Sequence, residues 1–448
     1  MPAFARRAPV SLNINRNPGG KGNEGQQSEG TAPESAVGDP QVFYFGVFDG
    51  HGGDQCSHYL RDSLHTYVEK SAEELGMQST LHAPWQHGRR PSTPSQPSTA
   101  ADAEDPVAAH ERLISTLVSS WRDTVGGYYR RFKPDYFTNS SGGKGIPLTP
   151  SVLKHTRNDT KLELSEPNAE DFATPNGHIL SYSFLAADLD FVNRQVPAPE
   201  SQESVLSSSG GPETGIDNDA ALGRHQHHST PPFLGGSTCS LALISTPSPT
   251  PFWHPSTPLT LVTAHVGDTR ILLCATETGA SVPLTTLHHP SSPGEAARLR
   301  RYAGAFTTDS FGEERFAAGL ANTRAFGDVR SKRMGVSAEP ELKLLHLKPG
   351  EGSFLVLVSD GVTGALSDQE IVDVVKEART PEEGSRALVA LAEELAVGEK
   401  GDSDNVTAMV VRLGGWERRS EGGGGSMRTR EAREWRRREA ADPRRGRM

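Results

Sequence analysis

The segment from Phe45 to Gly53 constrains this chain more than any other, because an apolar strand ends there on a carboxylate, an imidazole and several glycines. Its sequence, Phe-Gly-Val-Phe-Asp-Gly-His-Gly-Gly, places Asp49 at the tip of the strand, followed by Gly50 and His51. An Asp at this position can hold a divalent cation, and glycine lets the backbone approach the ion where a Cβ atom would clash. His51 is then close enough to act as a proton donor. A strand followed by a glycine-rich turn with an incidental Asp is the alternative interpretation.

The composition predicts one sizeable domain interrupted by polar insertions. The chain has 448 residues, of which only 34% are hydrophobic, and it contains 46 Gly and 32 Pro. We expect a partial N-terminal segment over residues 1–40, the main domain over 41–414 and a basic disordered tail over 415–448. Disordered insertions are predicted near residues 72–106, 134–176 and 196–232, where helical periodicity gives way to polar sequence.

Charge and cysteine content favour an intracellular protein that does not bind nucleic acid. The formal net charge of −10 disfavours nucleic-acid binding, because a polyanion requires a basic surface. No run of 18 apolar residues exists, so we expect no membrane span. Cys56, Cys239 and Cys274 suit neither a disulfide framework nor a zinc site, which favours a reducing compartment such as the cytoplasm or nucleus. Basic residues before Glu24 weakly resemble a transit peptide and keep the mitochondrial matrix as an alternative, although an ordinary segment of the domain also explains them.

Hydrophobic periodicity predicts an antiparallel sheet with amphipathic helices around it. Strands are expected at residues 240–244, 259–266, 271–275, 354–359 and 406–411. Helices are expected at residues 55–70, 110–132, 179–192, 295–302, 368–378 and 382–396. Gly267 and Asp268 are predicted to form a tight turn that joins two of these strands as a hairpin.

Two further carboxylates share the setting of Asp49. Asp360 ends the apolar strand 354–359, and Asp404 comes shortly before the strand 406–411. Three acids at strand ends can converge, and hard oxygen ligands of this type suit Mg²⁺ or Mn²⁺. Asp49 can bridge two ions, with the Gly50 carbonyl as a further ligand. Two metals about 4 Å apart can activate a shared water and clamp a phosphoryl group for in-line attack.

At this point the chain resembles the metal-dependent Ser/Thr protein phosphatases of type 2C, as a fungal-like member. The resemblance runs in order from about Phe43 to Val411 and is therefore far more specific than a single motif. Its motifs are Phe45 to Gly53, Gly236-Ser237-Thr238, Val266 to Arg270, Leu320 to Asp328, Glu339-Pro340, Ser359-Asp360-Gly361 and Asp404 to Thr407.

The resemblance implies an α+β fold, a four-layer αββα sandwich of two antiparallel sheets flanked by helices. It implies a protein-serine/threonine phosphatase, a phosphoric monoester hydrolase that uses two Mn²⁺ or Mg²⁺ ions. Phosphoserine and phosphothreonine would be hydrolysed by direct attack of a metal-bridging hydroxide. Asp49, Gly50, Asp360 and Asp404 would hold the metals, and His51 would be the general acid. We expect a monomer that acts on a phosphoprotein in signal transduction.

The chain departs from the family pattern at several positions. The family has an Arg and a Glu-Asp pair on a strand before the Asp-Gly-His motif, and residues 1–40 do not reproduce them. Either the chain begins after that strand or the element is lost, and we expect an exposed sheet edge and a weakened second metal site. Asp188 resembles a helical Asp that binds a weak third metal in some members, but its usual partner is here Gly364. No role is assigned to His288 and His289, and Asp268 and Asp328 are interpreted as turn residues.

A phosphatase-like scaffold that is catalytically impaired and binds a signalling partner is the alternative function. The missing Arg and Glu-Asp favour it. Three retained carboxylates with His51 argue against it, because their mutual repulsion is relieved only by a cation.

Overall fold

The computed structural model describes the chain in separate ranges. These are residues 4–5, 10–12, 41–74, 106–134, 150–155, 162–165, 175–195, 235–247, 250–300, 306–308, 314–316, 320–396, 405–419 and 424–440. Asp404 and most of the three predicted insertions therefore lie outside the described residues. No helix in these ranges is long and apolar enough to cross a membrane.

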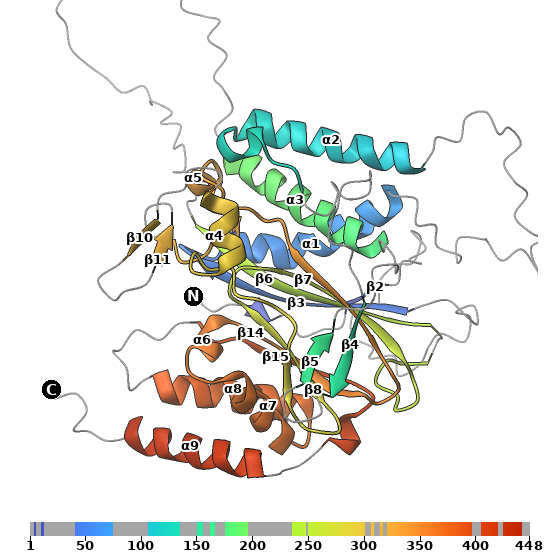
Figure 1. Ribbon diagram of the computed structural model, residues 1–448, viewed down its shortest axis with the longest axis vertical. Coiled ribbons are helices and arrows are strands. Elements are labelled where there is room, and N and C mark those ends of the chain that lie inside the picture. The colour runs from blue at the N-terminus through green and yellow to red at the C-terminus, as the bar shows by residue number, and fades with distance from the viewer. Residues whose placement is uncertain are drawn as a thin grey trace, which may run out of the picture.

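Two β-sheets face each other at the centre of the molecule (Figure 1). Within the described residues, the larger sheet follows the spatial order β1 (Phe4–Ala5), β3 (Gln41–His51), β6 (Gly236–Thr246), β7 (Leu259–Val266), β13 (Glu341–Leu347), β4 (Pro150–His155) and β5 (Leu162–Ser165). Two short strands join it at the side, β2 (Val10–Leu12) on β3 and β12 (Phe326–Gly327) on β6. The smaller sheet follows the order β15 (Ala408–Arg412), β14 (Gly352–Val358), β8 (Arg270–Ala275) and β9 (Ser281–Pro283). All pairings are antiparallel except that of β4 with β13.

Helices cover the outer face of each sheet and complete four layers (Figure 1). On the larger sheet lie α1 (Gln55–Glu74) and α3 (Pro175–Gln195), with α2 (Pro106–Thr124) and the 3₁₀ turn η2 (Gly127–Arg130) packed against α3. On the smaller sheet lie α7 (Asp368–Glu377) and α8 (Pro381–Ala396), with α9 (Gly424–Ala440) outside them. Shorter elements are α4 (Pro293–Arg300), β10 (Phe306–Thr308), β11 (Glu314–Phe316), α5 (Val329–Lys332), α6 (Asp360–Thr363) and η3 (Trp416–Arg418). This arrangement confirms the predicted αββα sandwich.

The central strands alternate their side chains between two cores. In β14, Leu355 and Leu357 pack between the two sheets, whereas Phe354, Val356 and Val358 pack against α7 and α8. Because side chains of a strand point alternately to opposite faces, a strand covered on both sides reads as a continuous apolar run.

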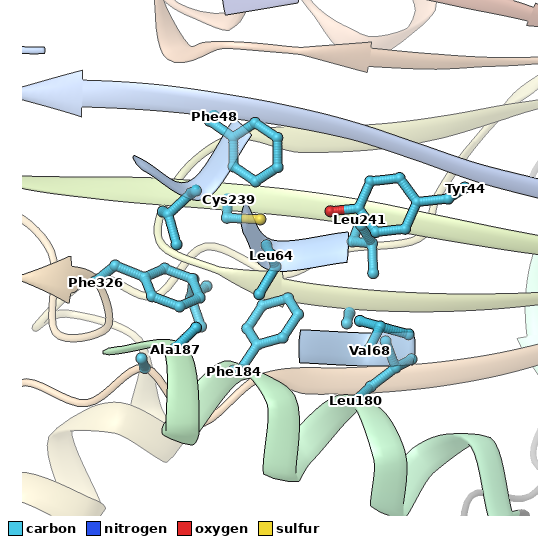
Figure 2. Packing of buried hydrophobic residues seen from close by; sticks show 14 of the residues in the cluster. Tyr44, Phe48, Leu64, Val68, Leu180, Phe184, Ala187, Cys239, Leu241 and Phe326 are labelled. Carbon is cyan, nitrogen blue, oxygen red and sulfur yellow. The ribbon is translucent and has the colours of Figure 1, made fainter. Parts of the chain in front are cut away.

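The strand β3, which carries the Asp-Gly-His motif, follows the same rule. Phe45 and Val47 face the smaller sheet, while Tyr44 and Phe48 face α1 and α3. Figure 2 shows Phe48 above Phe184 of α3, whose ring lies beside that of Phe326 from β12. Aromatic and β-branched residues favour such strands, and their burial fixes the register that places the strand end.

Three features differ from the sequence-based expectations. Gly267 and Asp268 do not close a hairpin, because β7 belongs to the larger sheet and β8 to the smaller one. The predicted insertion at 134–176 contains β4 and β5, which extend the larger sheet beyond β13. Residues 424–440 of the predicted disordered tail form α9.

The N-terminal residues also differ from the expectation of an exposed edge. β1 and β2 pair along β3, with Phe4 opposite Phe48 and Val10 opposite Tyr44. These two strands contain neither Arg nor an acidic residue, so they cover the edge without supplying the family's missing charged groups.

Candidate metal and catalytic site

Strand β3 delivers Asp49, Gly50 and His51 to one end of the larger sheet. These three residues pair with the first three residues of β6, from Thr238 back to Gly236. The Ser237 hydroxyl donates a hydrogen bond of 2.9 Å to the Asp49 backbone carbonyl, which fixes the backbone at the strand end. A Cβ atom on Gly50 would lie 2.6 Å from Ser57 Oγ at the start of α1, so the close packing of strand and helix requires glycine here.

His51 contacts a carboxylate that is distant in sequence. Its Nε2 lies 2.9 Å from Oδ2 of Asp328, whose side chain is 5% exposed, whereas the His51 side chain is 37% exposed. Partial burial lowers the pKa of His51, but the hydrogen bond and charge of Asp328, followed by the charges of Asp268 and Asp360, outweigh it and raise the pKa above its ordinary value. The imidazole is therefore biased toward the protonated form that a general acid needs.

Asp360 comes from the smaller sheet, where β14 ends and α6 begins. Hydrogen bonds of Ser359 tie this turn to the start of β15: its hydroxyl donates to the Asn405 carbonyl at 3.0 Å and accepts from the Thr407 N–H at 2.9 Å. A Cβ atom on Gly361 would lie 2.6 Å from the Asn405 carbonyl oxygen. The turn that carries Asp360 thus packs directly on Asn405, the residue after Asp404.

Asp268 reaches the same region from the turn between the sheets. Gly267 has φ of 101°, and a Cβ atom there would lie 2.3 Å from the Thr238 side chain on β6. The Asp268 carboxylate accepts a hydrogen bond of 2.7 Å from the Asn322 side-chain amide. The chain crosses from one sheet to the other at this point, and the crossing brings Asp268 close enough for its charge to act on His51.

The structure therefore adds Asp268 and Asp328 to the surroundings of His51. The sequence favours a turn for both, because each directly follows a glycine at the end of a strand. Asp49 and Asp360 also lie at strand ends but precede their glycine, so a strand end next to glycine was the available signal. The contact between His51 and Asp328 could not be predicted from local sequence, because the two residues are 277 positions apart.

Asp188 forms a buried ion pair with Lys332. Its Oδ2 accepts from Nζ of Lys332 at 2.5 Å, and its Oδ1 accepts from the Gly327 N–H at 2.8 Å. Both Asp188 and Lys332 have 0% side-chain exposure. Burial raises the pKa of Asp188 to about 6, although Lys332 and the Gly327 N–H oppose the shift. With both oxygens engaged in this buried pair, the geometry argues against Asp188 as a metal ligand.

A cluster of His265, His288 and Glu341 brings three potential ligand atoms within 4.8 Å of one another. Its hydrogen bonds oppose metal binding. Nε2 of His265 lies 2.9 and 3.0 Å from two backbone carbonyls, so it carries a proton. Nδ1 of His288 accepts from the Gly267 N–H at 3.0 Å, so Nε2 carries the proton of its neutral ring. Burial lowers the pKa of both imidazoles, and neither turns a lone pair toward Glu341. The cluster instead braces the Gly267–Asp268 turn.

The donors around His51 fit Mg²⁺ or Mn²⁺. Asp49 and Asp360 offer carboxylate oxygens, and the tight packing at Gly50 and Gly361 brings backbone close to them. These are hard oxygen ligands, with no thiolate among them, and such ligands suit Mg²⁺ and Mn²⁺ better than softer metals. The Asp360 turn lies against Asn405, and Asp404, the residue before it, lies outside the described residues.

Comparisons with known proteins show the family of this chain. A family model described as protein phosphatase 2C matches residues 180–401. Protein phosphatase 2C homolog 4 of Schizosaccharomyces pombe is 30% identical over 380 residues, which cover 84% of this chain and 73% of that protein. The mitochondrial protein phosphatase 1K of Xenopus laevis is 31% identical over 278 residues, which cover 60% of this chain and 68% of that protein. The chain therefore belongs to the protein phosphatase 2C family, and its activity is that of a metal-dependent protein-serine/threonine phosphatase.

Proposed function

We propose that this enzyme hydrolyses phosphoserine and phosphothreonine by direct attack of water on phosphorus, with two Mg²⁺ or Mn²⁺ ions at the sheet ends. The observation that carries the proposal is the meeting of the two sheets at His51. The carboxylate of Asp360, from the smaller sheet, acts electrostatically on the imidazole at the end of β3. Carboxylates gathered from both sheets can hold the two cations that clamp a phosphoryl group.

The proposed ligands are Asp49, the Gly50 carbonyl, Asp360 and Asp404. Bound Mg²⁺ or Mn²⁺ would lower the pKa of water and neutralise charge on the transferring phosphoryl group. Asp360 and Asp404 would hold one ion together with Asp49. The second ion would depend mainly on Asp49 and Gly50, because β1 and β2 contain no acidic residue.

His51 is the proposed general acid. Its ring is partly exposed, so a substrate oxygen can reach it, and its raised pKa keeps a proton available. A serine or threonine alkoxide is a poor leaving group and needs that proton. The step ends with the proton on the leaving oxygen and the phosphoryl group transferred to water.

Further proposals concern the partner and the compartment. The substrate is a phosphoprotein, and we propose that the enzyme acts as a monomer inside the cell, in the cytoplasm or nucleus. Cys56, Cys239 and Cys274 are buried free thiols, which supports a reducing compartment. The Xenopus relative is named as mitochondrial, which makes the mitochondrial matrix the second candidate.

Metal titration tests the proposed ligands. Isothermal titration calorimetry with Mn²⁺ is expected to show binding that Asp360→Asn weakens by at least about 10-fold, since even outer-shell changes cost 10- to 100-fold. Asp368→Asn is the matched control, because Asp368 pairs with Arg270 in the smaller sheet and does not contact His51. Equal Mn²⁺ affinity in the wild type and the Asp360 variant would remove Asp360 from the site.

A leaving-group comparison tests His51. His51→Ala is expected to lower kcat on a phosphopeptide by about 10²-fold or more, while turnover of a nitrophenyl phosphate falls much less. A nitrophenolate leaves without protonation, so it does not need the acid. Equal losses on the two substrates would contradict the proposed role.

A further inference from the structure

The geometry points to Asp328 as the positioning residue that orients the His51 imidazole toward the leaving oxygen of the substrate. This inference rests on the proposed function of His51 as proton donor and extends it to a second residue. Asp328 itself does not touch the phosphoryl group in this proposal. It acts by holding one nitrogen of the ring so that the other is presented.

The contact fixes which nitrogen is presented. Asp328 Oδ2 lies 2.9 Å from Nε2 of His51, and an ionised carboxylate only accepts hydrogen bonds. Nε2 therefore carries a hydrogen that is committed to Asp328. Nδ1 is the remaining nitrogen from which a proton can pass to the substrate, and the bond to Asp328 limits rotation of the ring about its side-chain torsions.

The backbone at Asp328 is unusual for a residue with a side chain. Its φ and ψ are 47° and 44°, in the left-handed region, and among the described residues it is the only non-glycine with positive φ. This conformation costs about 1 kcal/mol for a residue with a Cβ atom. Hydrogen bonds hold it in place: its N–H donates to the Gly235 carbonyl at 3.1 Å, and its own carbonyl accepts from the Ser331 N–H at 2.8 Å. Strain that the fold maintains in this way is often associated with a functional site.

Asp328 occupies the N-cap of α5 but does not use its carboxylate as a cap. An N-cap Asp normally accepts a hydrogen bond from the second or third N–H of its helix, which contributes about 1 kcal/mol. The Asp328 side chain makes no such bond. The carboxylate is directed at His51 instead.

The neighbouring strands leave room for this carboxylate. In the register of the larger sheet, Gly236 lies opposite His51 on one side and opposite Gly327 on the other. A Cβ atom on Gly236 would lie 2.6 Å from Oδ2 of Asp328. A glycine between the two partners is thus what allows Asp328 to approach His51 across the sheet.

The segment before Asp328 is also anchored. The Gly327 N–H donates to the buried Asp188 carboxylate, which pairs with Lys332 from α5. The carboxylate of Asp328 therefore extends from a rigid turn, and it can orient a side chain that is itself 37% exposed.

Three substitutions at Asp328 separate its carboxylate from its backbone. Asp328→Gly removes the carboxylate and suits positive φ, Asp328→Asn retains an acceptor oxygen and tolerates positive φ, and Asp328→Ala removes the carboxylate and adds strain. With a phosphopeptide, we expect kcat to fall about 10- to 100-fold in the Gly variant, with KM changing less than about threefold, and the Asn variant to recover part of the loss. With nitrophenyl phosphate, the Gly variant should stay within about threefold of wild type.

A double substitution and two further measurements complete the test. The His51→Ala, Asp328→Gly protein should be no slower on the phosphopeptide than His51→Ala alone, because Asp328 acts only through His51. Nitrogen NMR of the apo protein at alkaline pH should detect His51 as a single tautomer protonated at Nε2 in the wild type, and as a mixture in the Gly variant. Mn²⁺ affinity should be unchanged in the Gly variant, and Asp368→Asn should behave as wild type throughout.

The outcomes distinguish this inference from the proposed function. If His51→Ala shows the difference between substrates and Asp328→Gly loses activity equally on both, the positioning role is wrong and the acid role of His51 stands. If Asp328→Gly keeps the wild-type kcat on the phosphopeptide while Asp328→Ala loses it, the backbone and not the carboxylate is responsible. If His51→Ala shows no difference between substrates, the proposed acid fails, and the role of Asp328 fails with it.

Discussion

Lys332→Met tests the buried ion pair that supports the turn before Asp328. Lys332 Nζ donates to Asp188 at 2.5 Å and to the Ala325 carbonyl at 2.7 Å, and both side chains of the pair are fully buried. Methionine has a similar apolar stem but no charge. The substitution therefore leaves the Asp188 carboxylate buried with only the Gly327 N–H as a remaining partner for it.

The expected loss in the free energy of unfolding is about 3–4 kcal/mol at pH 7. Removing one partner of a buried pair typically costs about 3–5 kcal/mol. Proton uptake by Asp188 sets an upper limit on this loss, because the variant can keep the buried carboxyl neutral. Neutral Asp188 at pH 7, which is 3.2 pH units above its unfolded-state pKa of 3.8, costs about 1.4 kcal/mol per pH unit, or about 4.4 kcal/mol in total. Because the pKa of Asp188 is raised in the folded state, its ionisation destabilises the variant as pH rises. The difference in free energy of unfolding between Lys332→Met and the wild type should therefore shrink from pH 7 to pH 5.

Urea unfolding followed by tryptophan fluorescence measures the loss, and thermal unfolding should show a Tm lower by roughly 6–16 °C. The Asp188→Asn, Lys332→Met double variant should be more stable than Lys332→Met, because no charge is left without its partner. Lys343→Met is the matched control: Lys343 is partly exposed and pairs with Glu341 at 3.3 Å, which predicts a loss below about 1 kcal/mol. A loss below about 1 kcal/mol for Lys332→Met, or additive losses in the double variant, would refute the reasoning.

Two further predictions concern the C-terminal helix and a buried acid. Arg433 on α9 is 5% exposed and donates hydrogen bonds to a carboxylate and a backbone carbonyl of α7. Arg433→Glu should therefore lower the free energy of unfolding by about 2 kcal/mol or more, whereas Arg430→Glu on the exposed face should change it by less than about 0.5 kcal/mol. Equal Tm values for the two variants would contradict docking of α9. Burial raises the pKa of Glu295, but Arg324 and Arg298 outweigh it and hold the pKa well below its ordinary value. Glu295→Gln should therefore lower the free energy of unfolding by about 3 kcal/mol at pH 7, and this loss should shrink below about pH 4.5 in unfolding measurements at different pH. A loss that grows on acidification would be inconsistent with the pairing.

The sequence by itself determined the strands that carry the site and several of its groups. The strand before Asp49 and the strand before Asp360 are apolar runs that read as buried strands, and the structure places them as β3 and β14. Each ends on Asp next to Gly, and that local pattern was sufficient to select Asp49, Gly50, His51 and Asp360 as candidates. Asp404, selected in the same way, lies outside the described residues and stays a prediction.

Only the tertiary structure decided which residues meet. The turn at Gly267 and Asp268 has the local sequence of a hairpin, yet the chain crosses there between two sheets. β7 pairs with β6 and β13 in the larger sheet, and β8 pairs with β14 and β9 in the smaller one. Asp188 has the sequence context of a possible ligand, but its pairing with Lys332 144 positions away depends on how α3 packs beside α5. The Arg-rich tail is solvated by sequence criteria, yet α9 docks because α7 and α8 together present acidic side chains to it.

Asp328 illustrates the physical reason most directly. Local propensity acts over a few residues and assigns an Asp after Gly327 to a turn. The hydrogen bond to His51 forms only when β3, β6 and β12 align in register and leave Gly236 between the two side chains. That alignment follows from burial of apolar side chains along the whole sheet, which no single motif contains, and it is the packing of the sheet that brings the two residues together.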